Sequence, residues 1–218
     1  MPKLDAVVFD LDGTLVRYRG VDFESSWGAI ADAAGVGDEA RRLLEIYLPR
    51  HDAYPEWVRE QAQLLAGIPV ERVEAGIFPP PYARGVRQAI AALRDTYVLG
   101  ILSSGVSLVA EHVAEDLELS FAWANELEVE DGRFTGTSRT LVDLWSKADV
   151  LEQLAEQYGW SLDRVCFVGD HINDLPVLKR VGLPVAANPK DDALAAAVDH
   201  VIHDFEELPR LIRAFEDA

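Results

Sequence analysis

The chain has 218 residues, 49% of them hydrophobic, and a formal charge of −18 from 38 acidic and 20 basic residues. This composition is typical of a globular protein and excludes a disordered chain, and no apolar run approaches the roughly 18 residues of a membrane span. The acidic surface argues against nucleic acid or membrane partners, and a lone cysteine and a strand beginning almost at the N-terminus predict a cytoplasmic protein without a signal peptide.

The first predicted element is an apolar run, Ala6 to Phe9, which is typical of a buried parallel strand. It is followed by Asp10 and Asp12, whose side chains leave the strand end on the same side. Two crowded carboxylates repel each other unless a cation or a shared proton separates them. A bare Asp-x-Asp is most simply a strand cap, but the full string Val-Val-Phe-Asp-Leu-Asp-Gly-Thr-Leu is much more specific.

After this strand the pattern becomes helical. Residues 24–34, 39–48, 55–66 and 70–75 have helical spacing and are separated by glycine or proline. A stiff proline-rich connector follows at 78–82. We therefore predict a small all-helical cap domain, residues 17–81, inserted after the first strand of a core domain made of residues 1–16 and 82–218.

Beyond residue 85, helices alternate with strands. We expect helices at 86–94, about 106–117, 146–158, 175–181 and 191–197, strands at 98–102, 121–125, 165–168, 184–187 and 200–202, and a hairpin at 127–134. Such alternation predicts an α/β fold, a Rossmann-like doubly wound parallel sheet with helices on both faces. Sheets of this kind bind their ligands at the carboxyl ends of the strands.

Two further polar clusters fall near predicted strand ends or helix starts. Ser103 and Ser104 precede a predicted helix, where hydroxyls and free backbone N–H groups form a phosphate cradle. Lys147 begins another helix, where its charge opposes the helix dipole and a bound phosphate would resolve the conflict. Taken alone, a helix cap and an exposed lysine are the simpler interpretations.

The last cluster follows the predicted strand 165–168. Asp170 and Asp174 are four residues apart with Asn173 between them, so both carboxylates could face one side of a turn. Carboxylate oxygens are ligands that Mg²⁺ prefers. The alternative, an acid-rich helix cap, is weakened by the Gly-Asp pair that directly follows the apolar strand.

The order of these motifs is more specific than any one of them. Asp-x-Asp, then Ser, then Lys, then Gly-Asp-x-x-Asn-Asp resembles the four motifs of the haloacid dehalogenase (HAD) superfamily, over residues 3–178. Most members are Mg²⁺-dependent phosphatases. The chain is most similar to the phosphoserine phosphatase branch, which carries a helical cap between motifs one and two and a segment like residues 124–136 between motifs two and three.

This resemblance implies a role for each motif residue. Asp10 resembles the nucleophile that forms an aspartyl-phosphate, and Asp12 the general acid and base. Mg²⁺ would be held by four groups: Asp10, the backbone carbonyl of Asp12, Asp170, and Asp174 in support. The phosphoryl oxygens would be held by the remaining motif residues: Ser103, the N–H of Ser104, Lys147 and Asn173. The substrate would be a small phosphorylated metabolite, and the helical cap would act as a lid.

The chain departs from the branch at two positions that concern the substrate. An acidic residue that usually follows the first motif, and meets the serine amine, is matched here by Arg19. A cap arginine that meets the serine carboxylate is matched by Gln61, with Arg59 two residues away. Arg19 and Arg59 are therefore the candidate specificity residues, and Arg19 predicts a preference for acidic-tailed over amine-bearing substrates.

Other functions stay open at this point. The substrate could be a sugar phosphate or another anionic metabolite, and a phosphotransferase would carry the same motifs. A phospho-accepting receiver domain also combines aspartates, a Ser or Thr and a lysine on an α/β sheet. The acceptor on the first strand, the aspartate two residues on and the large helical insertion argue against that alternative.

Overall fold

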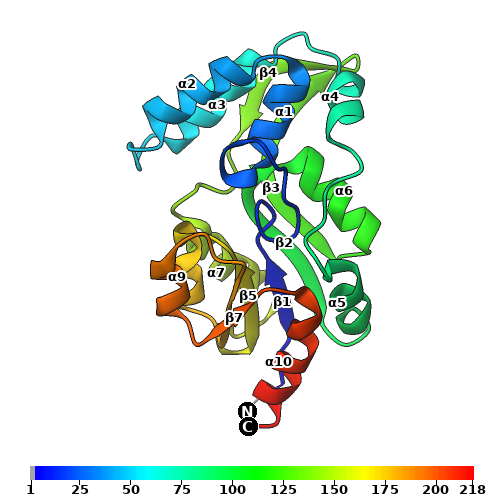
Figure 1. Ribbon diagram of the computed structural model, residues 1–218, viewed down its shortest axis with the longest axis vertical. Coiled ribbons are helices and arrows are strands. Elements are labelled where there is room, and N and C mark those ends of the chain that lie inside the picture. Colours follow the sequence, from blue (N-terminus) through cyan, green and yellow to red (C-terminus); the bar gives the residue numbers. More distant parts are fainter. Residues whose placement is uncertain (1–2) are drawn as a thin grey trace.

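A computed structural model, which describes residues 3–218, is built around one seven-stranded sheet (Figure 1). The strands are β1 (Ala6–Phe9), β2 (Val98–Val106), β3 (Phe121–Glu130), β4 (Arg133–Arg139), β5 (Val165–Gly169), β6 (Leu183–Ala187) and β7 (His200–Ile202). Their order across the sheet is β4-β3-β2-β1-β5-β6-β7. Only the β3–β4 pair of this sheet is antiparallel. The predicted α/β fold with a mostly parallel sheet is confirmed.

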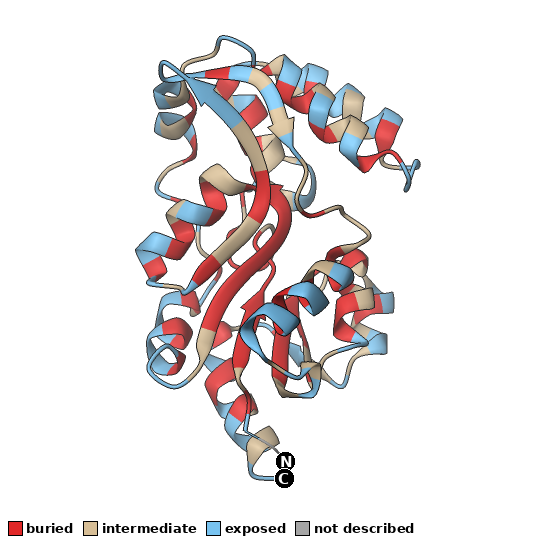
Figure 2. Ribbon diagram, turned by 180° about the vertical axis from the view of Figure 1, so that it is seen from behind, coloured by how far each residue is buried: buried red, intermediate tan, exposed pale blue. Residues whose placement is uncertain are grey.

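The strand β1 lies at the centre of the molecule, between β2 and β5, and all four of its residues are buried (Figure 2). Its side chains alternate between two hydrophobic cores, because successive strand residues point to opposite faces. Val7 and Phe9 belong to one core, and Ala6 and Val8 to the other. The apolar run therefore fixes the position of the residues that follow it.

Helices cover both faces of the sheet, as the doubly wound prediction requires. One core includes residues of α5 (Val86–Leu93), α6 (Ser107–Leu117) and α10 (Leu208–Glu216). The other includes residues of α7 (Lys147–Tyr158), α8 (Leu175–Leu178) and α9 (Asp192–Ala197). Short 3₁₀ helices are formed by Asp22–Glu24, Leu162–Arg164, Ile172–Asp174 and Phe205–Glu207. None of the helices within residues 3–218 is long and apolar enough to cross a membrane.

Five α-helices lie between β1 and β2, and the four that precede α5 form a separate group: α1 (Ser26–Ala34), α2 (Gly37–Tyr47), α3 (Tyr54–Leu64) and α4 (Val70–Ile77). They lie together at the top of Figure 1, beyond the carboxyl end of β1. The β3–β4 hairpin reaches this group, because the N–H groups of Gly67 and Val70 donate to the carbonyls of Phe134 and Gly132. The division into core and cap domains at residues 17 and 81 stays a prediction.

Two predicted boundaries are wrong. β2 does not end at Leu102 but continues to Val106, which pairs with Asn125 of β3, so the helix starts only at Ser107. The predicted short strand and hairpin are one long strand, β3, followed by β4. The two-residue turn between them, Asp131 and Gly132, has positive φ at both positions, as a tight hairpin requires.

The helix α10 was not predicted from the sequence. It is preceded by a capping box. The Asp204 side chain accepts a hydrogen bond from the Glu207 backbone, and the Glu207 side chain accepts one from the Asp204 backbone. This Asp-x-x-Glu spacing is a local signal that could have located the helix. Its buried residues, including Leu208 and Ile212, complete the core beneath β1.

Candidate active site

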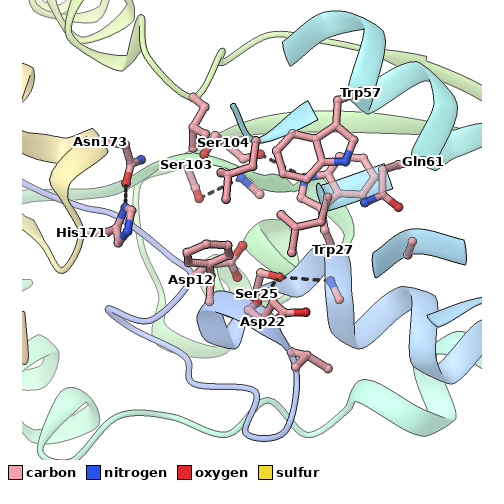
Figure 3. Close-up of a pocket in the computed structure, with 18 of the residues that line it drawn as sticks. Asp12, Asp22, Ser25, Trp27, Trp57, Gln61, Ser103, Ser104, His171 and Asn173 are labelled. Atoms are coloured by element: carbon pink, nitrogen blue, oxygen red, sulfur yellow. Dashed lines mark hydrogen bonds between the residues drawn. The ribbon is translucent and has the colours of Figure 1, made fainter. Parts of the chain in front are cut away.

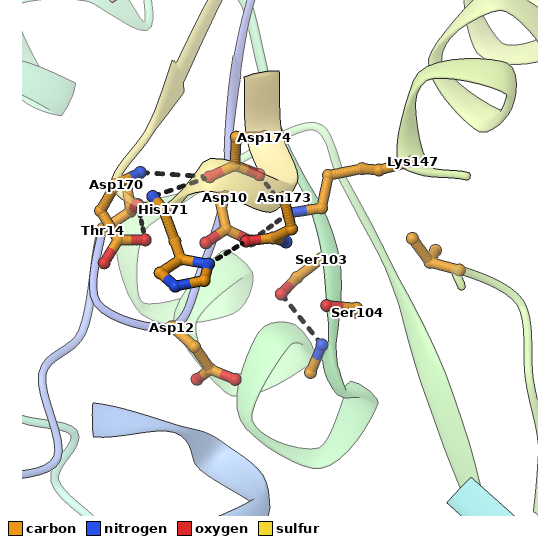
Figure 4. A network of polar contacts seen from close by, with 12 residues as sticks. Asp10, Asp12, Thr14, Ser103, Ser104, Lys147, Asp170, His171, Asn173 and Asp174 are labelled. Carbon is orange, nitrogen blue, oxygen red and sulfur yellow. Dashed lines mark hydrogen bonds and ion pairs between the residues drawn. The ribbon is translucent and has the colours of Figure 1, made fainter. Parts of the chain in front are cut away.

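The pairing of the strands brings the predicted motifs together. Phe9 of β1 lies opposite Ile101 of β2 and Val168 of β5. Asp10 follows Phe9 directly, and the second residues after Ile101 and Val168 are Ser103 and Asp170. Because these strands are parallel, their polar residues emerge at one edge of the sheet, where Figure 4 shows them facing one another.

Lys147, the first residue of α7, is only 1% exposed. Its Nζ is 2.9 Å from Asp10 Oδ1 and 2.5 Å from Asp174 Oδ1 (Figure 4). Burial by itself would lower the pKa of Lys147, but the charges of these two carboxylates outweigh it and raise the pKa above its ordinary value. The partners of this cation at a helix N-terminus are therefore two carboxylates of the chain itself.

Three buried carboxylates, those of Asp10, Asp170 and Asp174, each offer an oxygen within 4.8 Å of the others. Asp170 Oδ1 accepts a hydrogen bond from Thr14 Oγ1 at 3.3 Å, and Asp170 Oδ2 lies 2.9 Å from Lys190 Nζ. Burial raises the pKa of Asp170 and of Asp174, because it disfavours the charged form. An all-oxygen, carboxylate-rich set fits a hard divalent cation such as Mg²⁺.

Asp12 has different partners from Asp10. Its Oδ1 accepts the backbone N–H of Ser26 at 2.8 Å, and its Oδ2 accepts the Ser26 hydroxyl at 2.7 Å. Burial and the nearby charge of Asp10 raise the pKa of Asp12 to about 7, although both Ser26 bonds act in the opposite direction. A carboxyl group with this pKa is protonated in about half of the molecules at neutral pH, so it can both donate and accept a proton there.

The end of β2 is held from several sides. Ser103, which is 1% exposed, accepts the Gly105 N–H through its hydroxyl at 3.1 Å. The Ser104 carbonyl accepts three side-chain donors: Trp27 Nε1 at 3.2 Å, the Tyr54 hydroxyl at 2.5 Å and Asn125 Nδ2 at 2.8 Å. Residues from α1, α3 and β3 thus fix this end of β2.

The turn that follows β5 is fixed by its own side chains. Asp174 Oδ2 accepts the backbone N–H of Asp170 at 3.1 Å. Asn173 Oδ1 lies 2.8 Å from His171 Nδ1 (Figures 3 and 4). Asp170 and Asn173 both line a cavity at the strand ends, whereas Asp174 lies fully buried beside Lys147.

A cavity of about 150 Å³ opens between the strand ends and the inserted helices (Figure 3). The sheet side contributes mostly polar groups: Asp10, Asp12, Ser103, Ser104, Asp170, His171, Asn173 and Lys190. The inserted segment contributes mostly apolar groups, among them Trp27, Leu44, Leu48, Trp57 and Val58, and also the neutral amide of Gln61. The cavity therefore has one polar and one apolar wall.

The structure does not bring Arg19 or Arg59 to this cavity. Both side chains are exposed, neither lines the cavity, and Arg59 lies 3.6 Å from Glu56. Gln61, the position that the resemblance aligned with the cap arginine, does line it and is 7% exposed. The predicted preference for an acidic-tailed substrate, which depended on Arg19, loses its structural basis.

Sequence reasoning missed several residues that hold the site. Thr14, Ser26, Asn125 and Lys190 all contact predicted site residues. Thr14 belongs to the Asp-Gly-Thr string, and Asn125 is the one amide within a predicted strand, so both carried a local signal. Ser26 and Lys190 carried none, because their contacts form only when distant segments meet.

Comparisons with known proteins agree with this geometry. A family model for haloacid dehalogenase-like hydrolases matches residues 7–179. The chain belongs to this family. The predicted superfamily and the class of hydrolase are therefore confirmed.

Two curated relatives and one solved structure refine the comparison. The chain is 34% identical over 187 residues to a phosphoserine phosphatase of Archaeoglobus fulgidus, an alignment that covers 85% of this chain but only 53% of the relative. It is 30% identical to a phosphoserine phosphatase of Methanocaldococcus jannaschii, covering 84% of this chain and 85% of that protein. A substrate-bound phosphoserine phosphatase complex superposes with a TM-score of 0.79 at 28% identity, over 97% and 99% of the two chains. These similarities support the predicted phosphatase class.

Proposed function

We propose that this HAD-family chain is a Mg²⁺-dependent phosphomonoesterase that acts on a small phosphorylated metabolite through an aspartyl-phosphate intermediate. The observation that carries the proposal is that two aspartates at one strand end have different surroundings. Asp10 is held by the charged Lys147, whereas Asp12, on the same wall of the cavity, has a pKa of about 7.

The chemistry follows from these two environments. Asp10 Oδ1 is bound by Lys147, and Oδ2 makes no hydrogen bond to any residue in the described range 3–218, so Oδ2 is the oxygen suited to attack phosphorus. As the new Asp10–phosphorus bond forms, the phosphorus–oxygen bond to the alcohol breaks. Asp12, protonated near neutral pH, donates its proton to the departing oxygen. The ionised Asp12 then takes a proton from a water molecule that attacks phosphorus and restores Asp10.

The negative charge of the phosphoryl group needs fixed donors, since the chain as a whole is strongly acidic. Ser103, Ser104 and Asn173 line the cavity, which supports a role for the Ser103 hydroxyl, the Ser104 N–H and the Asn173 amide in holding the phosphoryl oxygens. Mg²⁺ would be held by Asp10 and Asp170, with Asp174 in support. When bound, it would supply the positive charge that a transferring phosphoryl group requires.

The test is turnover of p-nitrophenyl phosphate with Mg²⁺, in the wild type and in Asp10→Asn. We expect the variant to lose at least about 10³-fold in kcat, because an amide cannot form the intermediate. Circular dichroism should show that the variant is folded. Retained activity in a folded Asp10→Asn protein would remove Asp10 from the role of nucleophile.

A further inference from the structure

The wall of the cavity opposite the phosphate-binding edge is apolar. It is formed by Trp27 of α1, Leu44 of α2, and Trp57 and Val58 of α3, with Leu48 directly after α2. Figure 3 labels the two tryptophans. A phosphate ester whose phosphorus lies at Asp10 would direct its alcohol portion towards this wall. The chemistry of these side chains therefore decides which alcohol the site accepts.

The charged side chains that the insertion adds to the cavity are exposed to solvent. They are Asp22, Asp32 and Arg41. Arg41 already contacts two carboxylates, Asp38 at 2.9 Å and Asp22 at 3.6 Å. The other cation on the cavity wall, Lys190, lies 2.9 Å from Asp170 and 3.7 Å from Glu24. Among the described cavity residues, every lysine or arginine thus has a carboxylate partner.

The buried polar groups of the apolar wall carry no charge. Gln61 is 7% exposed and presents a neutral amide. The indole Nε1 of Trp57 is buried and, among residues 3–218, has no hydrogen-bond partner. In Figure 3 these two side chains lie beside each other at the apolar end of the cavity. They can satisfy an uncharged oxygen of a ligand, but neither can neutralise a carboxylate.

We infer that the preferred substrate is the phosphate monoester of an uncharged alcohol with a bulky apolar portion, and not an amino-acid ester such as phosphoserine. This inference rests on the proposed phosphatase function and adds the leaving group to it. Placing a substrate carboxylate against this wall would bury it without a free cation, which is costly. Placing an aromatic or branched alkyl group there would remove apolar surface from water on both sides.

The first experiment compares three esters of primary alcohols: 2-phenylethyl phosphate, ethyl phosphate and O-phospho-L-serine. The ammonium group makes serine the better leaving alcohol, so intrinsic reactivity works against the expected order. We expect kcat/KM for 2-phenylethyl phosphate to exceed both others by about 10-fold or more, from burial of the ring. A phosphoserine value equal to or above that of 2-phenylethyl phosphate would overturn the inference.

Two variants on one helix test the wall itself. Leu44→Glu places a charge on the cavity wall, and Ile46→Glu places the same charge on the same helix, at a side chain that is 54% exposed and does not line the cavity. We expect Leu44→Glu to lower kcat/KM for 2-phenylethyl phosphate about tenfold more than for ethyl phosphate. Ile46→Glu should leave the ratio of kcat/KM for 2-phenylethyl phosphate to kcat/KM for ethyl phosphate as in the wild type. Equal ratios in both variants would overturn the inference.

A third measurement separates failure of this inference from failure of the proposed function. If the protein turns over p-nitrophenyl phosphate but does not prefer 2-phenylethyl phosphate, the proposed phosphatase function is supported and the inference of an apolar leaving group is refuted. No turnover of any ester by folded, Mg²⁺-loaded protein would refute both.

Because Leu44 is only partly buried, the Leu44→Glu variant should fold. Trp57→Ala is a second variant that tests the wall, and it removes apolar surface without adding charge.

Discussion

Two aspartates separated by a single residue, Asp10 and Asp12, have opposite surroundings in this protein. Asp10 is paired with a buried ammonium, and Asp12 is bound by a hydroxyl and an amide from the first inserted helix. Burial and the nearby charge of Asp10 favour the protonated form of Asp12 and raise its pKa. Their local chemistry therefore follows from their partners, since the two residues have the same side chain.

Lys147 is the residue whose loss should affect the fold most directly. Replacing it by methionine leaves Asp10 and Asp174 buried without their cation, so we expect the free energy of unfolding to fall by about 3 kcal/mol or more. Urea denaturation measures this. Lys179→Met removes an exposed lysine and should stay within about 0.5 kcal/mol of the wild type. A Lys147→Met protein as stable as the control would contradict the prediction.

The raised pKa of Asp12 predicts a pH dependence of stability in metal-free protein. The folded chain keeps this proton up to about pH 7, whereas the unfolded chain loses it near 3.8. Between these values the folded state binds more protons, so this contribution to stability is complete below 3.8 and is lost as pH rises through about 7. Asp12→Asn cannot titrate, so it should gain roughly 2–4 kcal/mol relative to the wild type between about pH 4 and pH 8.

Urea denaturation in EDTA at several pH values tests this prediction. The comparison with Asp12→Asn isolates one group, because Asp170 and Asp174 titrate in both proteins. A difference between the two proteins that does not change with pH would show that Asp12 has an ordinary pKa in the folded chain.

At the scale of secondary structure, the site depends on where β2 ends and what holds that end. Asn125 of β3 is fully buried and donates through Nδ2 to the carbonyls of Ser104 and Val142, at 2.8 and 3.0 Å. Its Oδ1 accepts the N–H groups of Leu141 and Val142 at 2.8 and 2.9 Å. One amide thus joins the predicted phosphate-binding turn to the segment that leads into α7 and Lys147.

Asn125→Ala should therefore weaken both stability and turnover. It leaves several buried backbone groups unpaired, and we expect a loss of about 2–4 kcal/mol in the free energy of unfolding. Because Ser104 loses a support, kcat for p-nitrophenyl phosphate should also fall at least about tenfold. Gln63→Ala, which removes an exposed amide from α3, is the control and should change neither quantity. Unchanged kcat in Asn125→Ala would limit this residue to a structural role.

At the scale of the whole molecule, the chain has a net charge of −18 and also buries three neighbouring carboxylates, those of Asp10, Asp170 and Asp174. Such a cluster adds repulsion to the folded state that a bound divalent cation relieves. Binding to the folded state alone also stabilises it by mass action. Metal binding and folding should therefore be coupled.

We expect the thermal unfolding midpoint to rise by about 5 °C or more when Mg²⁺ is added in large excess over its dissociation constant. Sodium chloride at the same ionic strength separates this effect from general screening of the acidic surface. In Asp170→Asn the Mg²⁺-specific rise should disappear, since one ligand of the proposed set is lost. An equal rise with both salts would mean that no specific site is involved.

The sequence by itself determined the α/β fold, the four motifs and the order of the helices and strands as far as β7. These depend on local patterns, namely the apolar run before Asp10, the helical spacing of the insertion and the short strings around Lys147 and Asp170. Only the tertiary structure decided the partners of each side chain and the walls of the cavity. Arg19 follows the first motif closely but is exposed to solvent, whereas Trp57 and Gln61, which lie 38 and 42 residues further along the chain, line the cavity. Contacts between distant segments form only when helices and strands pack, so no local pattern records them.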